Sequence, residues 1–391
     1  MPTIMMTDTG LVPGDELLRQ LSQVTADRDV SPTLPPACYT DHDVFRYEIN
    51  TLFRRCWLGV GRADRWLAPG DFVSRDIGGV PLILIRNEDG DLKAFANTCR
   101  HRGSLLLKGD GNCKKIRCPF HCWTYDLDGR LIFAPRMDGM TGFDTGDYGL
   151  AEFRTGVVDG FTFVSLDAAA GELDEWLGDF TLMHAAWGLG QWATARVREF
   201  EVRCNWKSFL EGFNEYYHLP YVHPASINRM YPEPDDVDQV SGNYTTQFGN
   251  TQGNAALLSD RQGQAFPHAA SLIGRERNGI RYTWVYPNLT FAASSDSLWM
   301  YEAYPITPNR SHIVQTVCFP AQTTALTDFP GRAKHYYERI DTAIEEDIPF
   351  LEQQQAGLSS PFAEPGRFSP LEPSVANFAD WYAGRLSRAT G

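Results

Sequence analysis

Hydrophobic and polar residues follow two different patterns along the chain, and the change falls near residue 168. In the first part, the apolar runs are short and are separated by turn signals. VPLILIR (80–86) has the composition of a buried strand, and residues 161–167 form a last strand of the same kind. Asp89-Gly90 and Asp128-Gly129 are typical of hairpin turns. This pattern predicts a small antiparallel β-domain.

Beyond residue 168, longer strands are combined with helices. Four strand-like runs occur between residues 281 and 320, namely RYTWVYP, LTFAASS, LWMYEAYP and HIVQTVCFP. A helical segment follows at about 330–357, whereas residues 224–280 are polar and weakly periodic and are predicted to be a long loop. We therefore expect an α+β fold in which an antiparallel sheet wraps around a long C-terminal helix, a helix-grip or START-like arrangement.

The chain is long enough for two domains with separate cores. We expect an N-terminal arm (1–40) that packs on the larger domain, a small β-domain (41–167) and a larger α+β domain (168–391). Asp41 is placed to cap the first helix of the small domain.

The charge balance and the cysteine content limit the possible functions. The 391 residues include 35 basic and 49 acidic side chains, and a net charge of −14 argues against nucleic acid or an anionic membrane as a partner. No apolar run approaches the ~20 residues that span a bilayer. The first residues lack the features of a signal peptide, so we expect a cytoplasmic protein. In that reducing compartment, metal binding explains several of the eight cysteines better than disulfides do.

Two Cys/His pairs are the strongest chemical signal in the sequence. Cys99 and His101 form C-x-H, and Cys118 and His121 form C-x2-H. Two thiolates and two imidazoles can hold one zinc ion, or a two-iron cluster with Cys on one iron and His on the other. Cysteine leads both pairs, which favours a Rieske [2Fe–2S] cluster over zinc.

The residues around these pairs resemble a known family. CRHRG and CPFHCWTYDLDGRL are similar to the two cluster-binding loops of Rieske non-haem iron oxygenases, the ring-hydroxylating and demethylating α subunits. The resemblance extends from about residue 40 to 358. It identifies 41–167 as a Rieske domain and 168–391 as a catalytic domain. One departure is Cys122, since many members have Gly after the second His.

A second constellation lies in EGFNEYYHLPYVHP. Glu215 and His218 are three residues apart and would share one face of a helix. Pro220 and Pro224 would break that helix, so that His223 can swing back towards His218. Two imidazoles completed by one carboxylate form a facial triad, which suits Fe(II) and O₂ chemistry.

The third ligand is expected on the C-terminal helix. Ile340, Ile344, Asp347 and Leu351 fall on one stripe, and a lone buried carboxylate costs several kcal/mol unless it is paired or binds a metal. Either Asp347 faces a cation or the helix is turned to expose it. The family resemblance aligns Asp347 with the third iron ligand, and it implies that Glu215 bridges the two metal centres instead of binding iron.

The resemblance also implies an activity and partners. Electrons would enter at the cluster, and O₂ would be activated at the mononuclear Fe(II) to hydroxylate or N-dealkylate a small organic substrate. No Gly-rich dinucleotide fingerprint occurs in the sequence. We therefore expect a separate NAD(P)H-dependent flavin and iron–sulfur reductase, with or without a ferredoxin. Family members form head-to-tail trimers, which predicts a homotrimer.

For the substrate, Glu at the bridging position is similar to choline, glycine betaine and carnitine monooxygenases. A quaternary ammonium group is recognised by an aromatic cage, for which Trp284, Tyr286, Trp299 and Tyr301 are candidates. The same side chains could be core aromatics, or could hold an aromatic or polycyclic substrate. A Rieske electron carrier without catalytic iron is the alternative from another functional class.

Overall fold

The computed structural model describes residues 4–7, 10–227 and 230–388 and divides the chain into two compact units. The smaller unit is Phe53–Ala170, and the larger combines Met1–Leu52 with Gly171–Gly391. The second boundary lies close to the change of sequence pattern. The first differs from the expected one, because α3 (His42–Glu48), capped by Asp41 as predicted, belongs to the larger unit.

The reason for this difference is a buried ion pair on α3. Glu48 is buried and accepts hydrogen bonds from Lys207 Nζ and Tyr382 Oη, both in the larger unit. Removing Glu48 from this pair would leave the Lys207 ammonium buried and uncompensated, which is strongly destabilising. The ion pair therefore holds α3 to the larger unit.

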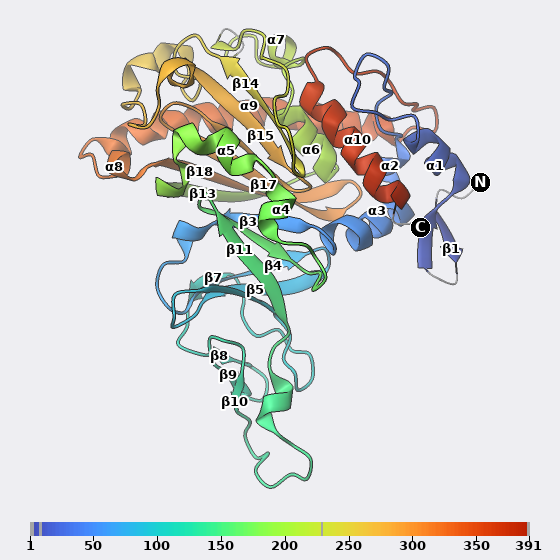
Figure 1. The fold of residues 1–391 in the computed structure, drawn as a ribbon, viewed down its shortest axis with the longest axis vertical. Helices are drawn as coiled ribbons and strands as arrows, with labels where there is room; N and C mark the ends of the chain where they lie inside the picture. Colours follow the sequence, from blue (N-terminus) through green and yellow to red (C-terminus); the bar gives the residue numbers. More distant parts are fainter. Residues whose placement is uncertain (1–3, 8–9, 228–229, 389–391) are drawn as a thin grey trace. The chain divides into compact units, whose positions relative to one another are not determined.

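The smaller unit consists of two antiparallel sheets formed by β3 to β12, most of which are labelled in Figure 1. The order in the seven-stranded sheet is β3-β12-β11-β6-β5-β4-β7, and in the three-stranded sheet it is β10-β9-β8. The strands are β3 (Trp57–Arg62), β4 (Asp71–Ile77), β5 (Val80–Arg86), β6 (Leu92–Ala96), β7 (Asp110–Asn112), β8 (Ile116–Arg117), β9 (Thr124–Tyr125), β10 (Leu131–Phe133), β11 (Glu152–Val158) and β12 (Phe161–Ser165).

The predicted turn signals close two of these hairpins. Gly90 lies between β5 and β6 with φ +87°, and Gly129 lies between β9 and β10 with φ +77°. A Cβ atom at Gly129 would lie 2.7 Å from the Phe95 ring, so the position requires glycine for space as well as for its backbone angle. The predicted antiparallel β-domain is confirmed.

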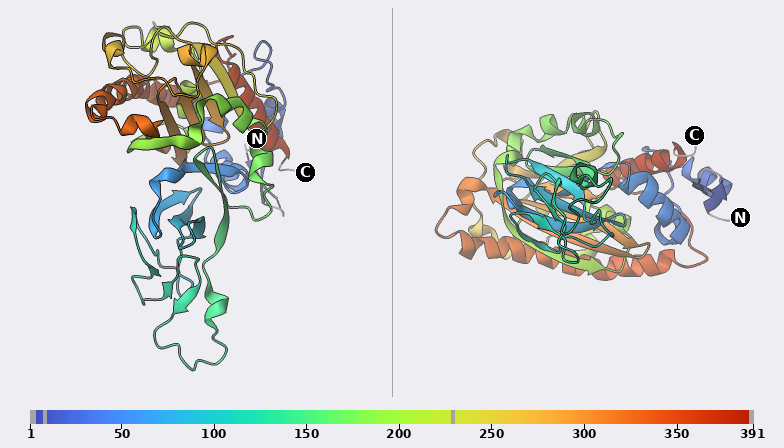
Figure 2. Two further views of the ribbon diagram at one scale, coloured as in Figure 1. Left: turned by 60° about the vertical axis from the view of Figure 1, so that its left-hand side comes forward. Right: turned by 90° about the horizontal axis from the view of Figure 1, so that it is seen from below.

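The larger unit contains a six-stranded antiparallel sheet in the order β13-β18-β17-β16-β15-β14. A single long helix, α9 (Phe329–Leu358), runs along it, and Figure 2 shows this helix from two further sides. The predicted sheet with a long C-terminal helix is confirmed. The strands are β13 (Trp192–Val202), β14 (Tyr244–Asn250), β15 (Gly279–Val285), β16 (Leu289–Ala293), β17 (Leu298–Thr307) and β18 (Arg310–Pro320).

Strand β14 lies inside the segment that the sequence predicts to be a long loop. It reads YTTQFGN, with two threonines, a glutamine and a glycine, and so lacks the apolar run of a buried strand. It nevertheless pairs with β15 in regular register from Tyr244↔Val285 to Asn250↔Gly279. As an edge strand, it is fixed by pairing with a neighbour more than by its own composition.

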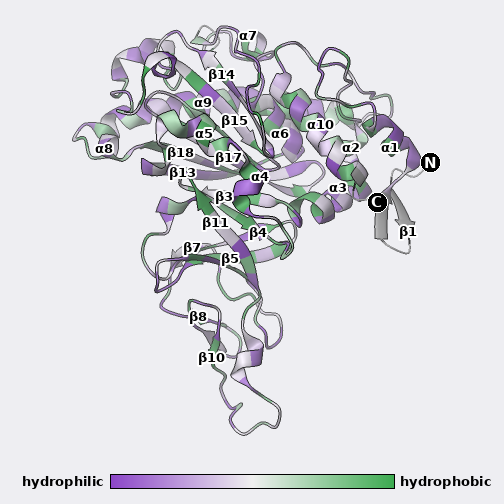
Figure 3. Ribbon diagram, in the orientation of Figure 1, coloured by the Kyte–Doolittle hydropathy of each residue, from purple (hydrophilic) through white to green (hydrophobic). Residues whose placement is uncertain are grey.

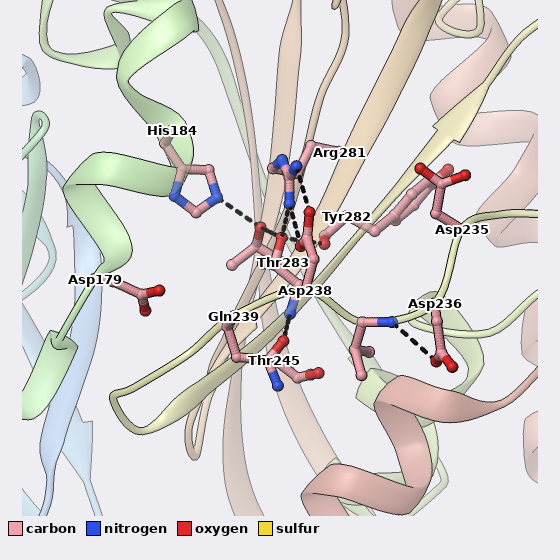
Figure 4. A network of polar contacts seen from close by, with 12 residues as sticks. Asp179, His184, Asp235, Asp236, Asp238, Gln239, Thr245, Arg281, Tyr282 and Thr283 are labelled. Carbon is pink, nitrogen blue, oxygen red and sulfur yellow. Dashed lines mark hydrogen bonds and ion pairs between the residues drawn. The ribbon is translucent and has the colours of Figure 1, made fainter.

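Helices cover the two faces of this sheet with different chemistry. On one face, the Tyr301 ring packs 4.9 Å from Phe213 of α6 (Trp206–Phe213), and Arg339 of α9 lies over Trp299. On the other face, Nε2 of the buried His184 lies 2.8 Å from Thr283 Oγ1, in the polar network of Figure 4. Burial lowers the pKa of His184 to about 3, so this imidazole stays neutral and structural.

Helix α9 is amphipathic, and its residues alternate between hydrophilic and hydrophobic colours in Figure 3. Ile340 and Ile344 of the predicted stripe are buried, and Asp347 is half-buried. Pro349 lies inside the helix, which continues to Leu358. The buried stripe therefore faces the sheet and brings Asp347 with it.

The remaining elements of the larger unit are short, apart from one C-terminal helix. No helix in the described part of the chain is long and apolar enough to cross a membrane. These elements are β1 (Ile4–Thr7), β2 (Gly10–Pro13), α1 (Asp15–Leu21), α2 (Ala37–Thr40), α4 (Leu173–Leu177), α5 (Phe180–His184), α7 (Leu219–Val222), α8 (Ala321–Thr324) and α10 (Pro373–Arg388).

Candidate metal centres

Each Cys/His pair of the smaller unit lies on a tight turn that backbone hydrogen bonds close. In the first, Cys99 N–H donates to Ser104 O at 2.9 Å, and Gly103 N–H donates back to Cys99 O. In the second, Cys118 N–H donates to Trp123 O at 2.8 Å, and Cys122 N–H donates to Cys118 O. These bonds fix the backbone of both loops.

The two imidazoles face each other through the same ring atom. Nδ1 of His101 lies 3.1 Å from Nδ1 of His121, and the ring centroids are 4.6 Å apart. Trp123 stacks on the His101 ring at 5.0 Å and limits its rotation. The pKa of His101 is lowered by partial desolvation and by the neighbouring His121, which favours the neutral ring that a metal requires.

The two thiols are buried behind the imidazoles. Tyr125 Oη lies 3.4 Å from Cys99 Sγ and accepts a hydrogen bond from Arg100 N–H. Burial raises the pKa of Cys118, but N–H groups of the backbone and the Cys99 thiol outweigh it, so the pKa is lowered overall. Two buried thiols, one of them with a lowered pKa, and two Nδ1 atoms that face each other form a donor set that fits a Rieske [2Fe–2S] cluster.

Cys122, the departure from the family pattern, has an unusual backbone. Its φ angle is +60°, in the left-handed region that glycine adopts most readily. The common Gly at this position therefore has a conformational reason, and a cysteine here carries strain.

In the larger unit, the segment that carries Glu215 and His218 differs from the expected continuous helix. Helix α6 ends at Phe213, and Asn214 closes it by donating its side-chain amide to Leu210 O. Residues 215–218 form a bend, in which the Glu215 carboxylate accepts hydrogen bonds from the N–H groups of Tyr217 and His218. The two residues therefore approach through this bend and not through a shared helix face.

The bend and α7 bring His218 and His223 to Asp347 of α9. The two Nε2 atoms lie 3.2 Å apart. Asp347 Oδ1 lies 3.5 Å from Nε2 of His218 and 2.9 Å from Nε2 of His223. Among the described residues, these three form the group of side chains that could hold a metal ion. Two imidazoles and one carboxylate are the donor set of a facial triad, which fits Fe(II).

In His218 and in His223, the Nδ1 atom, which does not face the metal position, contacts a carboxylate. Glu215 Oε1 is hydrogen-bonded to Nδ1 of His218, and Glu346 Oε2 lies 2.7 Å from Nδ1 of His223. Ser226 Oγ donates to the same Glu346 oxygen at 2.6 Å. Burial lowers the pKa of His218, but the Glu215 and Asp347 carboxylates raise it overall. Each carboxylate therefore directs the Nε2 lone pair to the metal position.

Glu346 and Ser226 are not among the site residues predicted from the sequence. The adjacency of Glu346 to Asp347 was a signal for a supporting role, because consecutive helical residues point in directions about 100° apart and reach different partners.

A cavity of about 450 Å³ opens beside the triad within the larger unit. His218, Asp347 and Glu215 line it together with two further glutamates, Glu211 and Glu372. Burial raises the pKa of both glutamates to about 7. The cavity wall is therefore less negatively charged at neutral pH than its composition suggests.

The four aromatic candidates divide into two pairs. Trp299 and Tyr301 lie on the sheet face covered by α6 and α9, where the triad is built. Trp284 stacks on Phe378 of α10 at 3.9 Å, and Tyr286 packs against the same ring at 5.4 Å. The second pair is therefore covered by α10, and none of the four candidates lines the cavity beside the triad.

Comparison with known families identifies both units. Residues 189–388 match the model described as the ring hydroxylating alpha subunit (catalytic domain), and residues 56–151 match the Rieske [2Fe–2S] domain.

Two curated proteins illustrate the relationship. The oxygenase subunit of glycine betaine monooxygenase from Pseudomonas aeruginosa is 28% identical over 96% of this chain and 94% of its own length. Chloroplastic choline monooxygenase from Arabidopsis thaliana is 28% identical over 88% of this chain and 81% of its own length.

A solved structure of a quaternary ammonium Rieske monooxygenase, reported with carnitine oxidation and inter-subunit electron transfer, superimposes with a TM-score of 0.79. It is 25% identical to this chain and covers 92% of it and 97% of its own chain.

Proposed function

Because the chain belongs to the family of ring-hydroxylating α subunits of Rieske oxygenases, we propose that it is the terminal oxygenase for a small quaternary ammonium compound. The observation that carries the oxygenase assignment is the convergence of His218 Nε2, His223 Nε2 and Asp347 Oδ1 on one point. A Rieske electron carrier has no use for this second donor set.

Each donor set has a distinct role in this proposal. Cys99, His101, Cys118 and His121 would hold the [2Fe–2S] cluster, and His218, His223 and Asp347 would hold a mononuclear Fe(II). When bound, these groups supply one-electron transfer and O₂ activation. Glu215 and Glu346 orient the two histidine rings through Nδ1.

The partners follow from what the sequence lacks. Without a dinucleotide fingerprint, the chain depends on a separate NAD(P)H reductase with flavin and iron–sulfur centres, with or without a ferredoxin. We further propose a homotrimer in which Glu215 bridges the cluster of one subunit and the iron of the next. The exposed position of His101 supports this arrangement, because an electron can leave the smaller unit through it.

The substrate class is supported by the relatives and by aromatic side chains that line the cavity beside the triad. The related proteins are named for glycine betaine, choline and carnitine. Phe213 and Phe350 line this cavity and offer rings against which a quaternary ammonium group can pack.

A substrate-depletion screen tests this proposal. The iron-loaded protein with a surrogate reductase is offered quaternary amines, aromatic acids and polycyclic hydrocarbons under O₂. We expect depletion of a quaternary amine, and none with Asp347→Ala. Iron analysis accompanies the screen, since three irons per chain fit an oxygenase and two fit an electron carrier. Oxidation of a polycyclic hydrocarbon, with no turnover of any quaternary amine, would exclude the proposed substrate class.

A further inference from the structure

The cavity beside the iron triad contains a buried hydroxyl group without a partner. Ser208 of α6 is only 1% exposed and lines this cavity, and its Oγ forms no hydrogen bond with any described residue. A buried hydroxyl that is left unsatisfied costs about 1–3 kcal/mol. Of the described side chains in the cavity wall, Ser208 alone has a buried polar atom that lacks a partner. The hydroxyl is therefore placed to meet a molecule inside the cavity.

Carboxyl groups dominate the polar part of the cavity wall. Glu211, Glu215, Asp347 and Glu372 line the cavity, and no lysine or arginine of the described chain does so. An ionised carboxylate only accepts hydrogen bonds. A wall of this composition therefore complements a cation that donates them.

The carboxylates differ in how far they are already engaged. Glu215 is hydrogen-bonded to Nδ1 of His218, and Asp347 belongs to the triad. Glu211 Oε1 accepts a hydrogen bond from Tyr39 Oη, whereas Glu211 Oε2 takes part in no hydrogen bond with a described residue. One oxygen of Glu211 is therefore left for a ligand.

The two available oxygen atoms come from one helix face. Ser208 and Glu211 are three residues apart on α6, which places their Cβ atoms about 5–6 Å from each other. Phe213 and Phe350 line the same cavity with aromatic rings. Ring faces attract a cation and pack against its alkyl groups. The wall thus offers acceptors for an N–H group and apolar surface for alkyl groups.

We propose that this cavity binds a small alkylammonium ion that carries at least one N–H bond, which is shared between Ser208 Oγ and Glu211 Oε2. Aliphatic amines are protonated at neutral pH, as the lysine side chain is. A quaternary ammonium ion has the same charge and a similar shape, but it has no N–H to donate. The inference rests on the cavity wall alone, so it does not require that the chain oxidises a quaternary amine.

The ligand class includes the amine that N-dealkylation of a quaternary ammonium compound leaves behind. In that reaction, O₂ with an electron pair from the reductase and two protons hydroxylates an N-alkyl carbon, and the second oxygen atom leaves as water. The N–C bond then breaks and the carbon leaves as a carbonyl compound. The nitrogen keeps the bonding pair and takes the hydroxyl proton. The product therefore gains the N–H that the substrate lacks, and we expect it to compete for this cavity.

A matched pair of cations tests the inference. Binding of trimethylammonium and of tetramethylammonium to the iron-loaded protein is measured by calorimetry without O₂, so that no turnover occurs. The measurement is made at pH 8, because burial raises the pKa of Glu211 to about 7 and its ionised form prevails above that pH. We expect trimethylammonium to bind roughly 10- to 100-fold more tightly, as one charge-assisted hydrogen bond implies.

Three variants assign the preference to the two residues. Ser208→Ala and Glu211→Gln should each reduce the preference for trimethylammonium, whereas Ser208→Thr keeps the hydroxyl and should retain it. Thr316→Val is the matched control. Thr316 of β18 also has a buried hydroxyl without a partner among the described residues, but it does not line this cavity. Its variant should therefore leave the preference unchanged.

The outcomes separate this inference from the proposed function. A preference for trimethylammonium that Ser208→Ala or Glu211→Gln reduces, and that Thr316→Val leaves intact, supports the inference. The same result without turnover of any quaternary amine in the depletion screen supports the inference and contradicts the proposed substrate class. Equal affinity of the wild-type protein for the two cations overturns the inference, and so does a preference that both Ser208→Ala and Glu211→Gln retain or that Thr316→Val also loses.

Discussion

Glu346 Oε2 lies 2.7 Å from Nδ1 of His223, so this ring has only Nε2 left for a metal. The contact comes from the residue next to Asp347, whose Oδ1 lies 2.9 Å from that same Nε2. One turn of α9 therefore supplies both Glu346, which orients the His223 ring, and Asp347, which shares the metal position with His223. Supporting contacts of this kind raise metal affinity because they fix the ring and its tautomer.

Glu346→Ala should weaken Fe(II) binding roughly 10- to 100-fold. Glu346→Gln should weaken it less, because its amide oxygen still accepts a hydrogen bond from Nδ1. Chelator competition measures the affinity, and the Rieske spectrum should stay unchanged. The exposed neighbour Glu345 provides the control variant Glu345→Ala. Equal iron affinity in Glu346→Ala and Glu345→Ala would show that this contact does not support the metal.

A second prediction concerns the backbone strain at Cys122. Because its φ angle is +60°, Cys122→Gly should stabilise the smaller unit by roughly 0.5–1 kcal/mol and leave the cluster spectrum intact. Thermal unfolding followed at the cluster absorbance measures the change. Gly103→Ala is the opposite control, since Gly103 has φ +72° with open space at its Cβ position. Gly103→Ala should destabilise the smaller unit by a similar amount. If neither variant changes the stability, the backbone at Cys122 is not strained.

The sequence was sufficient for the parts of the fold and site that strong local patterns determine. Ligand spacing pointed to His218 and His223, and the apolar stripe of α9 together with the family resemblance pointed to Asp347. These are the side chains that the structure brings together. Similarly, Asp-Gly pairs located two hairpins, because a positive φ angle at Gly90 or Gly129 is a local requirement.

Features that depend on contacts between distant residues were missed. Strand β14 is defined by its pairing with β15, and α3 belongs to the larger unit because Glu48 meets Lys207. The burial of Arg339 is equally invisible in the sequence, where an arginine on a helix is usually an exposed one. Only the three-dimensional arrangement shows that it is buried.

A third prediction tests whether one subunit's cluster serves another subunit's iron. His101→Ala chains lack a complete cluster site, and Asp347→Ala chains lack a complete iron site. If cluster and iron cooperate between subunits of a trimer, co-expressed mixtures should recover about one quarter of wild-type activity per site. Each pure variant should be inactive. If each site uses the cluster and iron of a single chain, the mixture should be as inactive as its components.

A last prediction uses the titration of Glu211, which is half-buried on α6 and accepts a hydrogen bond from Tyr39 Oη at 2.7 Å. Burial raises its pKa from 4.5 to about 7, Lys207 and the Tyr39 hydrogen bond oppose this shift, and Glu372 adds to it. The folded protein therefore binds the proton more tightly than the unfolded chain. Its contribution to stability is complete below about pH 4.5 and is lost as the pH rises through about 7.

Between pH 5 and pH 8, Glu211 alone should lower the free energy of unfolding by about 2.5 kcal/mol. Glu211→Gln keeps an acceptor for Tyr39 and carries no titrating group, so its stability should fall less over the same range. The pKa of Glu372 is also raised to about 7, so the stability of the variant still depends on pH to some extent. Chemical denaturation of both proteins at several pH values measures the difference. If the two curves are parallel, Glu211 is already ionised in the folded protein at pH 5, and its burial must be compensated by a charge or solvent contact.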